Sequence, residues 1–309
     1  MLKIGIIGFG KMGMLHGALL NGTNEAKIVA ICDKSFVMRI GFKKIYPNVH
    51  TYSDLNKMLL NEQLDAVVIA TPSFNHIESA IKCASYGCNL FIEKPLAVSY
   101  KDACRLVDFL EEKKDIKVQV GFVNRFAATF NRLKSLIDSN RIGEIKRAEA
   151  QMFTGDVFEK HLGWRYNKKI SGGGVLIDFG IHMIDLLIWY FGEVAEVAGI
   201  GRKIYSEEVE DEFAANIIFK NGTECIFETS WSKEDYRKSY SCIKLSGTNG
   251  EIIVTDQTLD IYEKGILAEN YTYPDLYNGA FIDIGGLLFS HQIDSFMKLI
   301  REDYHEGVD

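Results

Sequence analysis

Two side chains that can share a proton stand four positions apart in the segment from Gly172 to Asp185. If this glycine-led, apolar segment is helical, Asp178 and His182 lie on one face of the helix, about one turn apart. A carboxylate beside an imidazole fixes the tautomer of the ring and raises its basicity, which suits a general base near neutral pH. A hydrogen-bonded pair that merely holds a core helix has the same spacing. On these two residues alone, the structural interpretation is the stronger one.

Lys94 is a third candidate for chemistry. It follows the apolar run Asn89–Ile92, which is typical of a buried strand, and it comes directly before Pro95. A lysine at the end of such a strand can bind a substrate hydroxyl or carbonyl and stabilise developing alkoxide charge. Pro95 keeps Lys94 out of helical backbone angles and permits a cis peptide bond that would fix its direction. The alternative interpretation is a surface lysine in a turn.

The N-terminal segment has the pattern of a dinucleotide-binding site. The apolar run Leu2–Gly8 predicts a strand buried on both faces, and a glycine loop and a helix-compatible segment follow it. In that loop, Gly8 permits the tight turn, Gly10 lets a pyrophosphate approach the backbone, and Gly13 allows the helix to pack against the strand. The free N–H groups at the start of the helix would face the phosphates. The next predicted strand ends at Asp33, whose carboxylate would hold the adenosine ribose hydroxyls.

Asp33 also bears on the choice of cofactor. Its carboxylate would repel the 2′-phosphate of NADP, so the sequence favours NAD. Lys34, Lys43 and Lys44 could offset that repulsion, and NADP therefore stays an alternative.

Up to residue 121 the chain alternates between short apolar runs and helical patterns. The predicted strands are Leu2–Gly8, Lys27–Cys32, Asp65–Ala70, Asn89–Ile92 and Lys117–Gly121, and the predicted helices between them include 55–61, Asn75–Tyr86 and Ser99–Lys114. This βαβ succession predicts a doubly wound parallel sheet, which binds ligands at the carboxyl ends of its strands. We therefore predict a dinucleotide-binding Rossmann domain, of the α/β class, over residues 1–122.

From Ile145 the pattern changes to longer strands with alternating apolar and polar residues. They are predicted over Ile145–Thr154, Glu193–Ile204, Glu212–Phe219, Thr223–Ser230, Tyr236–Ser246, Glu251–Thr255 and Thr258–Glu263. Asn221-Gly222 between two of them is a strong hairpin signal. We predict that residues 123–309 form an α+β domain for substrate binding and oligomerisation, with a large, mostly antiparallel, open-faced sheet and a final helix over Ser290–Glu302. Its uncovered face is expected to pair copies into a homodimer or homotetramer.

Composition narrows the class of protein. The chain has 309 residues and a formal charge of −7, with no basic block, so we expect no nucleic-acid partner. No apolar run reaches the roughly 18 residues of a membrane helix, and we expect no membrane partner. The N-terminus lacks the cleavage region of a signal peptide. The six cysteines show no metal-ligand spacing, so we expect reduced thiols, no metal, and a cytoplasmic location.

Six motifs occur in order along nearly the whole chain. They are GFGKMGMLH at 8–16, TPSFNH at 71–76, EKP at 93–95, GFVNRF at 121–126, WR at 164–165 and GGGVLIDFGIHMIDLLIWYFG at 172–192. Together they resemble the Gfo/Idh/MocA family of NAD(P)-dependent oxidoreductases, of the glucose–fructose oxidoreductase and inositol dehydrogenase type. Members of that family usually continue beyond the helix matched by 290–302, whereas this sequence ends at Asp309.

The resemblance implies a catalytic cleft between a Rossmann domain and an open-faced sheet domain. It implies that His182 takes the proton of a substrate hydroxyl while hydride passes to the nicotinamide, that Asp178 orients His182, and that Lys94 binds the reacting oxygen. The cofactor-binding positions that we assign from the motifs are Gly8, Phe9, Gly10, Lys11, Met12, Gly13, Asp33, Lys34, Thr71, Pro72, Asn75, His76, Glu93, Lys94 and Asn124. The expected substrate-binding residues are Lys94, Arg125, Trp164, Arg165, Asp178 and His182. Asp185 is expected to be structural.

Three functions fit this constellation. The first is an NAD(P)-dependent dehydrogenase that oxidises a hydroxyl of a sugar, cyclitol or nucleotide-sugar. The second is a redox-neutral glycosidase that oxidises its substrate only transiently with a retained NAD. The third is a sugar or dinucleotide sensor without turnover, which is disfavoured because Lys94, Asp178 and His182 are all present.

Overall fold

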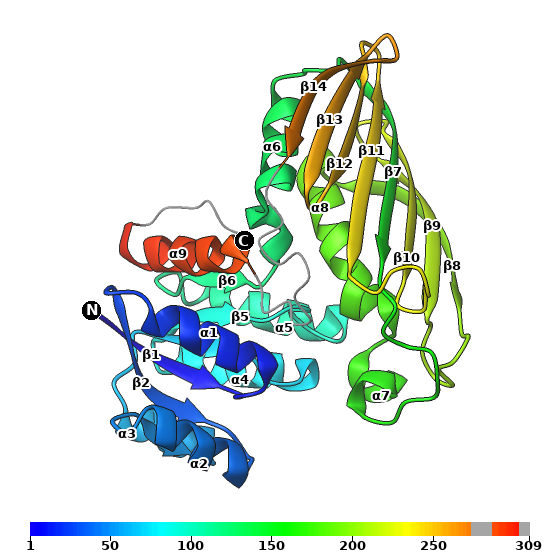
Figure 1. The fold of residues 1–309 in the computed structure, drawn as a ribbon. Coiled ribbons are helices and arrows are strands. Elements are labelled where there is room, and N and C mark those ends of the chain that lie inside the picture. The colour runs from blue at the N-terminus through cyan, green and yellow to red at the C-terminus, as the bar shows by residue number, and fades with distance from the viewer. Residues whose placement is uncertain (273–285, 303–309) are drawn as a thin grey trace. The chain divides into compact units, whose positions relative to one another are not determined.

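The computed structural model describes residues 1–272 and 286–302. It divides into two compact units. The first consists of residues 1–122 together with the C-terminal helix α9 (Leu287–Glu302), and the second begins at Val123 and takes in the described residues that follow, up to 272. In Figure 1 the first unit runs from blue to cyan, with α9 in red, and the second runs from green to orange.

The first unit is built on a six-stranded sheet. Its strands are β1 (Leu2–Ile7), β2 (Ala26–Cys32), β3 (His50–Tyr52), β4 (Ala66–Ile69), β5 (Asn89–Ile92) and β6 (Val118–Val120). They lie in the order β3-β2-β1-β4-β5-β6, and every neighbouring pair is parallel. The predicted doubly wound parallel sheet is therefore confirmed. The direction of the strand order reverses between β1 and β4, which is where sheets of this kind bind ligands.

Helices cover both faces of this sheet. They are α1 (Lys11–Asn21), α2 (Phe36–Ile45), α3 (Leu55–Asn61), α4 (His76–Ser85) and α5 (Tyr100–Glu111), with a 3-10 turn, η1 (Ser73–Asn75), before α4. In β4, Ala66 and Val68 belong to one apolar cluster, with side chains of α1, α2 and α9, whereas Val67 and Ile69 belong to another, with side chains of α3, α4 and α5. A strand buried on both faces must be apolar throughout, as this one is.

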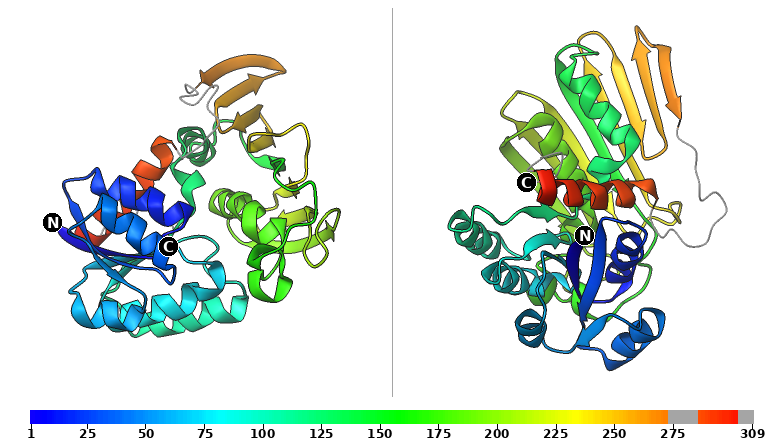
Figure 2. Two further views of the ribbon diagram at one scale, coloured as in Figure 1. Left: turned by 60° about the horizontal axis from the view of Figure 1, so that its bottom comes forward. Right: turned by 90° about the vertical axis from the view of Figure 1, so that its left-hand side faces the viewer.

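The final helix corrects the predicted domain boundary. The sequence placed residues 123–309 in one domain, but α9 belongs to the first unit. Its buried side chains Ile293, Phe296 and Met297 join the same apolar cluster as Ile4 and Ile6 of β1. Figures 1 and 2 show α9 lying beside α1. An amphipathic helix at the end of a chain packs where apolar surface is left over, and its sequence does not say which sheet offers it.

The second unit is built on an eight-stranded sheet. Its strands are β7 (Ile145–Phe153), β8 (Val194–Arg202), β9 (Glu212–Phe219), β10 (Glu224–Ser230), β11 (Tyr240–Gly247), β12 (Glu251–Thr255), β13 (Thr258–Glu263) and β14 (Ile266–Thr272). The order is β14-β13-β12-β11-β7-β10-β9-β8, and only β7 and β10 pair in parallel. Asn221-Gly222 joins β9 to β10 as predicted, with Gly222 at φ +87°. The strands β3 and β14 and the helix α2 had not been predicted.

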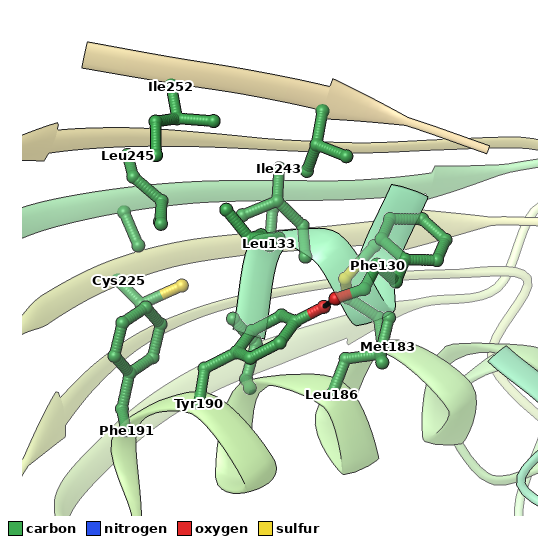
Figure 3. Packing of buried hydrophobic residues seen from close by; sticks show 14 of the residues in the cluster. Phe130, Leu133, Met183, Leu186, Tyr190, Phe191, Cys225, Ile243, Leu245 and Ile252 are labelled. Atoms are coloured by element: carbon green, nitrogen blue, oxygen red, sulfur yellow. Dashed lines mark hydrogen bonds between the residues drawn. The ribbon is translucent and has the colours of Figure 1, made fainter. Parts of the chain in front are cut away.

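Helices pack on one face of this second sheet. They are α6 (Ala128–Asp138), the π-helical turn η4 (Leu176–Gly180) and α8 (Ile181–Phe191), and the unit also contains η2 (Val123–Phe126), η3 (Trp164–Tyr166) and α7 (Lys168–Ser171). Figure 3 shows Phe130 and Leu133 of α6 and Met183, Leu186 and Tyr190 of α8 pointing toward the strands. The Tyr190 hydroxyl donates a hydrogen bond to the Phe130 carbonyl oxygen over 2.9 Å, which ties the two helices together. This core fixes α8 and thus the residues at its N-terminal end.

The helical stretch Lys168–Phe191 meets the length and hydropathy criteria for a membrane span, with a mean hydropathy of 1.5. The sequence had suggested that no segment of the chain is that apolar. Half of its most apolar window is buried, and Met183, Leu186 and Leu187 lie in the core of the second unit. The stretch is therefore accounted for as a core helix.

Candidate active site

The glycine loop follows β1 and begins α1. Gly8 has φ +84°, and a Cβ atom there would lie 2.7 Å from the Ala70 carbonyl oxygen. A Cβ atom on Gly13 would lie 2.1 Å from the Gly8 carbonyl oxygen, whereas one on Gly10 would meet no atom within 4 Å. Gly8 and Gly13 are thus required by the protein's own packing, and Gly10 leaves open space beside the backbone.

The beginning of α1 suits an anion. Gly10 caps the helix without a side-chain hydrogen bond, and no acidic residue lies in the first turn. The N–H groups there are therefore available to a phosphate. Lys11 and Met12 are the first two residues of the helix, and Phe9 is buried against Phe42 with ring centroids 4.6 Å apart. Open space at Gly10 together with uncapped N–H groups fits a dinucleotide pyrophosphate.

Asp33 lies at the end of β2, half-buried beside the glycine loop. Its Oδ2 accepts a hydrogen bond from the Phe9 N–H over 2.6 Å, and its Oδ1 accepts one from the Ser35 N–H over 2.7 Å. The Lys34 side chain is exposed. Sequence reasoning missed Arg39, whose Nη1 donates to the carbonyl oxygens of Asp33 and Lys34 over 2.6 and 2.9 Å. It was missed because no helix had been predicted over α2, whose second turn brings Arg39 back toward Asp33.

The other predicted cofactor residues of the first unit lie where β4 ends. Thr71 and Pro72 follow the strand, and Asn75 ends the turn η1. The Thr71 Oγ1 atom is buried and has no hydrogen-bond partner within 1–272 and 286–302. Because the Thr71 N–H lies 2.8 Å from where a Gly8 Cβ atom would stand, this orphaned hydroxyl belongs to the glycine-loop region.

Lys94 lies in the turn after β5, and the Lys94–Pro95 peptide bond is cis. Glu93, which precedes it, is 6% exposed. Its Oε1 lies 2.6 Å from His16 Nε2, and its Oε2 accepts the Lys94 N–H over 3.2 Å. The Glu93 carboxylate had been predicted to bind cofactor, but the structure turns it toward these protein partners.

His76 was also predicted to contact the cofactor, and in the structure it is 1% exposed. Its Nδ1 lies 2.8 Å from the Pro95 carbonyl oxygen and its Nε2 lies 2.9 Å from the Thr71 carbonyl oxygen. Burial lowers the pKa of the ring, although the two carbonyl oxygens oppose that shift. The His76 ring thus lies between the turns after β4 and β5, and both of its nitrogens face backbone carbonyl oxygens.

Asp178 and His182 lie at the N-terminal end of α8. The stretch that holds Asp178 is not an α-helix but a π-helical turn, Leu176–Gly180. A π-turn displaces its side chains relative to α-helical spacing and often marks a functional site. A Cβ atom on Gly180 would lie 2.8 Å from Thr229 Cγ2 of β10, so the turn lies close against the sheet. The sequence predicted the helix here but gave no sign of the wider turn.

Asp178 forms an ion pair with Arg165 of η3. Burial alone would lower the pKa of the Arg165 guanidinium, but the Asp178 carboxylate raises it, so the guanidinium stays charged. Arg165 also lies over the Trp231 ring, 5.7 Å from its centroid, and Trp164 is 36% exposed beside it. The predicted substrate residues Trp164, Arg165, Asp178 and His182 thus belong to neighbouring turns of one unit.

Two of the three glycines before Asp178 have roles that are set by the protein's own backbone. Gly172 ends α7 in the left-handed region, with φ +85°. A Cβ atom on Gly174 would lie 2.1 Å from the Glu210 carbonyl oxygen. Glu210 also accepts the Gly174 and Leu176 N–H groups through Oε1, over 2.9 and 3.2 Å. The absence of a side chain at Gly174 therefore leaves room for the Glu210 backbone, and the Glu210 carboxylate accepts the N–H groups at the start of the helical stretch.

Arg125 forms an ion pair within its own unit. It was predicted to bind substrate, but its Nε and Nη2 donate to the two carboxylate oxygens of Asp185, each over 2.8 Å. Its guanidinium also lies over the Trp189 ring, 5.4 Å from the centroid. The Arg125 side chain is 17% exposed and that of Asp185 is 6% exposed. This pair holds η2 on α8. Asn124, a predicted cofactor residue, is half-buried in the same turn.

Comparison with known proteins agrees with this arrangement. Residues 2–122 match the oxidoreductase family with an NAD-binding Rossmann fold, and residues 130–253 match the C-terminal domain of the GFO/IDH/MocA proteins. The chain belongs to the GFO/IDH/MocA oxidoreductases. This confirms the family that the six motifs resemble, and it confirms an NAD-binding Rossmann domain followed by an open-sheet domain.

The relatives within the GFO/IDH/MocA family are distant. Oxidoreductase P35 of Formosa agariphila is 28% identical over 275 residues, which cover 87% of this chain and 84% of that protein. D-Glucoside 3-dehydrogenase of Escherichia coli is 27% identical, covering 80% of this chain and 75% of that protein. The structure of levoglucosan dehydrogenase in complex with NADH has a TM-score of 0.86 and 23% identity, covering 99% of this chain and 92% of that chain.

Proposed function

We propose that the protein is an NAD(P)-dependent dehydrogenase that transfers hydride between a nicotinamide and a hydroxyl-bearing carbon of a sugar, cyclitol or nucleotide-sugar. One observation carries the proposal. A chain of an NAD-binding oxidoreductase family has Lys94 after the carboxyl end of a parallel strand, and Asp178 and His182 at the start of a helix. Relatives named as glucoside and levoglucosan dehydrogenases support the substrate class.

The bound nicotinamide supplies the hydride acceptor, and this chain's residues handle the proton. His182 takes the proton of the reacting hydroxyl as general base. Lys94 donates a hydrogen bond to the reacting oxygen and stabilises the negative charge that develops there. Asp178, held in place by Arg165, orients the His182 ring and supports its positive charge after proton uptake. An ionised, paired Asp178 is what this role requires.

For the cofactor we propose NAD rather than NADP. The Asp33 carboxylate at the end of β2 supports this choice, because a carboxylate that holds the adenosine ribose hydroxyls repels a 2′-phosphate. Arg39 is the residue that opposes this preference, because its guanidinium lies beside the Asp33 and Lys34 carbonyl oxygens. Lys43 donates to the Val49 carbonyl oxygen over 3.0 Å and is thus directed away from this role. Asp33→Ala should therefore shift preference toward NADP through Arg39.

We also propose a cytoplasmic homo-oligomer in which a second copy covers the open face of the eight-stranded sheet. The face away from α6 and α8 carries the exposed side chains Ile218 and Ile226, and all nine residues of the edge strand β8 are exposed. Light scattering of the purified protein tests the oligomeric state, and Ile218→Glu with Ile226→Glu should yield monomers.

The direct test is turnover by Lys94→Ala and His182→Ala against a panel of polyols, sugars, glycosides and nucleotide-sugars, with NAD and with NADP. Formation of reduced nicotinamide is expected from the unaltered protein and should fall about 10²- to 10⁴-fold in each variant. Lys101→Ala, at an exposed position on α5, is the control. Full turnover by both variants would refute the roles assigned here. Glycoside cleavage without added cofactor would instead favour the redox-neutral reaction.

A further inference from the structure

Glu93 stands between the glycine-loop helix and the turn that carries Lys94. Its Oε1 lies 2.6 Å from Nε2 of His16, a residue of α1 that is 0% exposed, and its Oε2 accepts the Lys94 N–H. A Cβ atom on Gly121 would lie 3.1 Å from Glu93 Oε2, so the end of β6 leaves room for this carboxylate and little else. One buried carboxylate thus links α1, β5 and the Lys94 backbone.

A second buried histidine fixes the other side of the same turn. His76 is 1% exposed and bridges the Pro95 and Thr71 carbonyl oxygens over 2.8 and 2.9 Å. Thr71 in turn borders Gly8, the first residue of the glycine loop. On one side of Lys94, His16 of α1 contacts Glu93, which accepts the Lys94 N–H. On the other side, His76 links Pro95 to Thr71. Each side of the turn is therefore connected by one histidine to the glycine-loop region.

Filling the space around His16 does not by itself require a side chain with two polar nitrogen atoms. A carboxylate only accepts hydrogen bonds, so the ring donates to Glu93 through Nε2, which leaves Nδ1 as the second polar atom of the ring. Among the described residues that Nδ1 atom is buried without a partner, and aromatic rings of Phe91 and Phe289 lie next to the imidazole. A buried polar atom without a partner is unfavourable. A residue needed only to fill this space would be better replaced by an apolar ring.

We propose that His16, Glu93 and His76 are positioning residues that set the place of Lys94 relative to the glycine loop. This rests on the function proposed for Lys94. His16 and Glu93 act through the Lys94 N–H, and His76 acts through the Pro95 carbonyl. None of the three touches the reacting atoms. A displacement of about 1 Å at a reacting group can cost about 100-fold in rate, so small movements of this turn should be visible in kcat.

The first experiment replaces the three residues while following kcat, substrate KM and the Kd for NAD in the full-length protein. Glu93→Ala, His16→Phe and His76→Phe should lower kcat about 10- to 100-fold, with less change in the Kd for NAD. Glu93→Gln should recover much of kcat, because an amide oxygen still accepts from His16 or Lys94. His50→Phe is the matched control, since His50 makes an equally short contact of 2.6 Å with Glu62 but is exposed.

The second experiment repeats Glu93→Gln and His76→Phe in a Lys94→Ala background, with single-turnover rates measured at high enzyme concentration. If the residues act through Lys94, they should cause no further loss there. Full multiplication of the two losses would overturn the proposal. If Lys94→Ala alone retains full turnover, the function proposed for Lys94 fails instead. Thermal unfolding identifies variants that do not fold, and Glu93→Gln, which preserves shape, then decides the outcome.

Discussion

Asp178 and Asp185 lie on one helical stretch and each pairs with an arginine, but the two pairs differ in burial and geometry. Arg125 binds both carboxylate oxygens of Asp185, and the two side chains are 17% and 6% exposed. Arg165 binds Asp178 through one N–H group, and their side chains are 42% and 27% exposed. The Arg125–Asp185 pair is thus a buried, bidentate contact between two helices, whereas the Arg165–Asp178 pair is partly open to water.

The contrast follows from what water can do at each place. When a buried pair loses one partner, the other charge cannot be hydrated, so the cost falls on stability. When a half-exposed pair loses one partner, water takes its place and the cost to stability is small. We therefore expect the Arg125 pair to matter for folding and the Arg165 pair to matter for catalysis.

The largest effect should come from the buried pair. Arg125→Met should lower the free energy of unfolding by about 3–5 kcal/mol, because Asp185 is left buried without its counter-charge. Denaturant unfolding of the variant measures this. The double variant Arg125→Met with Asp185→Leu removes both charges and should recover most of the loss. If the single variant is as stable as the unaltered protein, the distinction between the two pairs fails.

Sequence reasoning reached the two aspartates but not this distinction. The motifs placed Asp178 beside His182 and left Asp185 as structural, and the parallel and open sheets followed from strand patterns. The partner of Asp185 was out of reach, because Arg125 lies 60 residues earlier and a bidentate contact depends on how η2 packs on α8. The π-turn was equally hidden, since an Asp and a His four residues apart fit an ordinary helix. The pairing of Arg125 with Asp185 was accordingly not foreseen, and its predicted contact with substrate stays a prediction.

The π-turn itself can be probed at Gly180, which lies between the two aspartates. A Cβ atom there would lie 2.8 Å from Thr229 Cγ2 and 3.2 Å from Phe227 Cζ, both in the core. Gly180→Ala should therefore cost about 1–3 kcal/mol of stability and also lower kcat, because Asp178 belongs to this turn. Gly41→Ala, a helical glycine with no atom within 4 Å of the added methyl, should instead stabilise the protein slightly. Equal effects of the two substitutions would contradict the packing described for the turn.

A pH series sharpens the comparison at Asp185. Burial raises the pKa of this carboxyl, and the Arg125 guanidinium opposes the shift. A carboxyl with a folded-state pKa above its unfolded value of about 3.9 favours folding fully below that value and loses this contribution as the pH rises through the folded-state pKa. Removing Arg125 raises the pKa further. The stability deficit of Arg125→Met should thus shrink as the pH falls from 7 toward about 4.5, by up to about 1.4 kcal/mol per pH unit. A deficit that does not change with pH would show that Asp185 is not the group left uncompensated.

The smallest effect on stability should come from the exposed pair. Arg165→Met should change the free energy of unfolding by no more than about 1 kcal/mol, because Asp178 can be hydrated in its place. The same variant should lower kcat, since the role proposed for Asp178 beside His182 needs a carboxylate that is held in place. Arg165→Lys keeps the charge without the planar guanidinium, so its kcat should lie between that of the unaltered protein and that of Arg165→Met. Lys160→Met breaks another exposed ion pair of the second unit, with Glu207, and should affect neither stability nor turnover. If Arg165→Met unfolded the protein as readily as Arg125→Met, exposure would not be what separates the two pairs. If it left kcat unchanged, Asp178 would need no partner to serve His182.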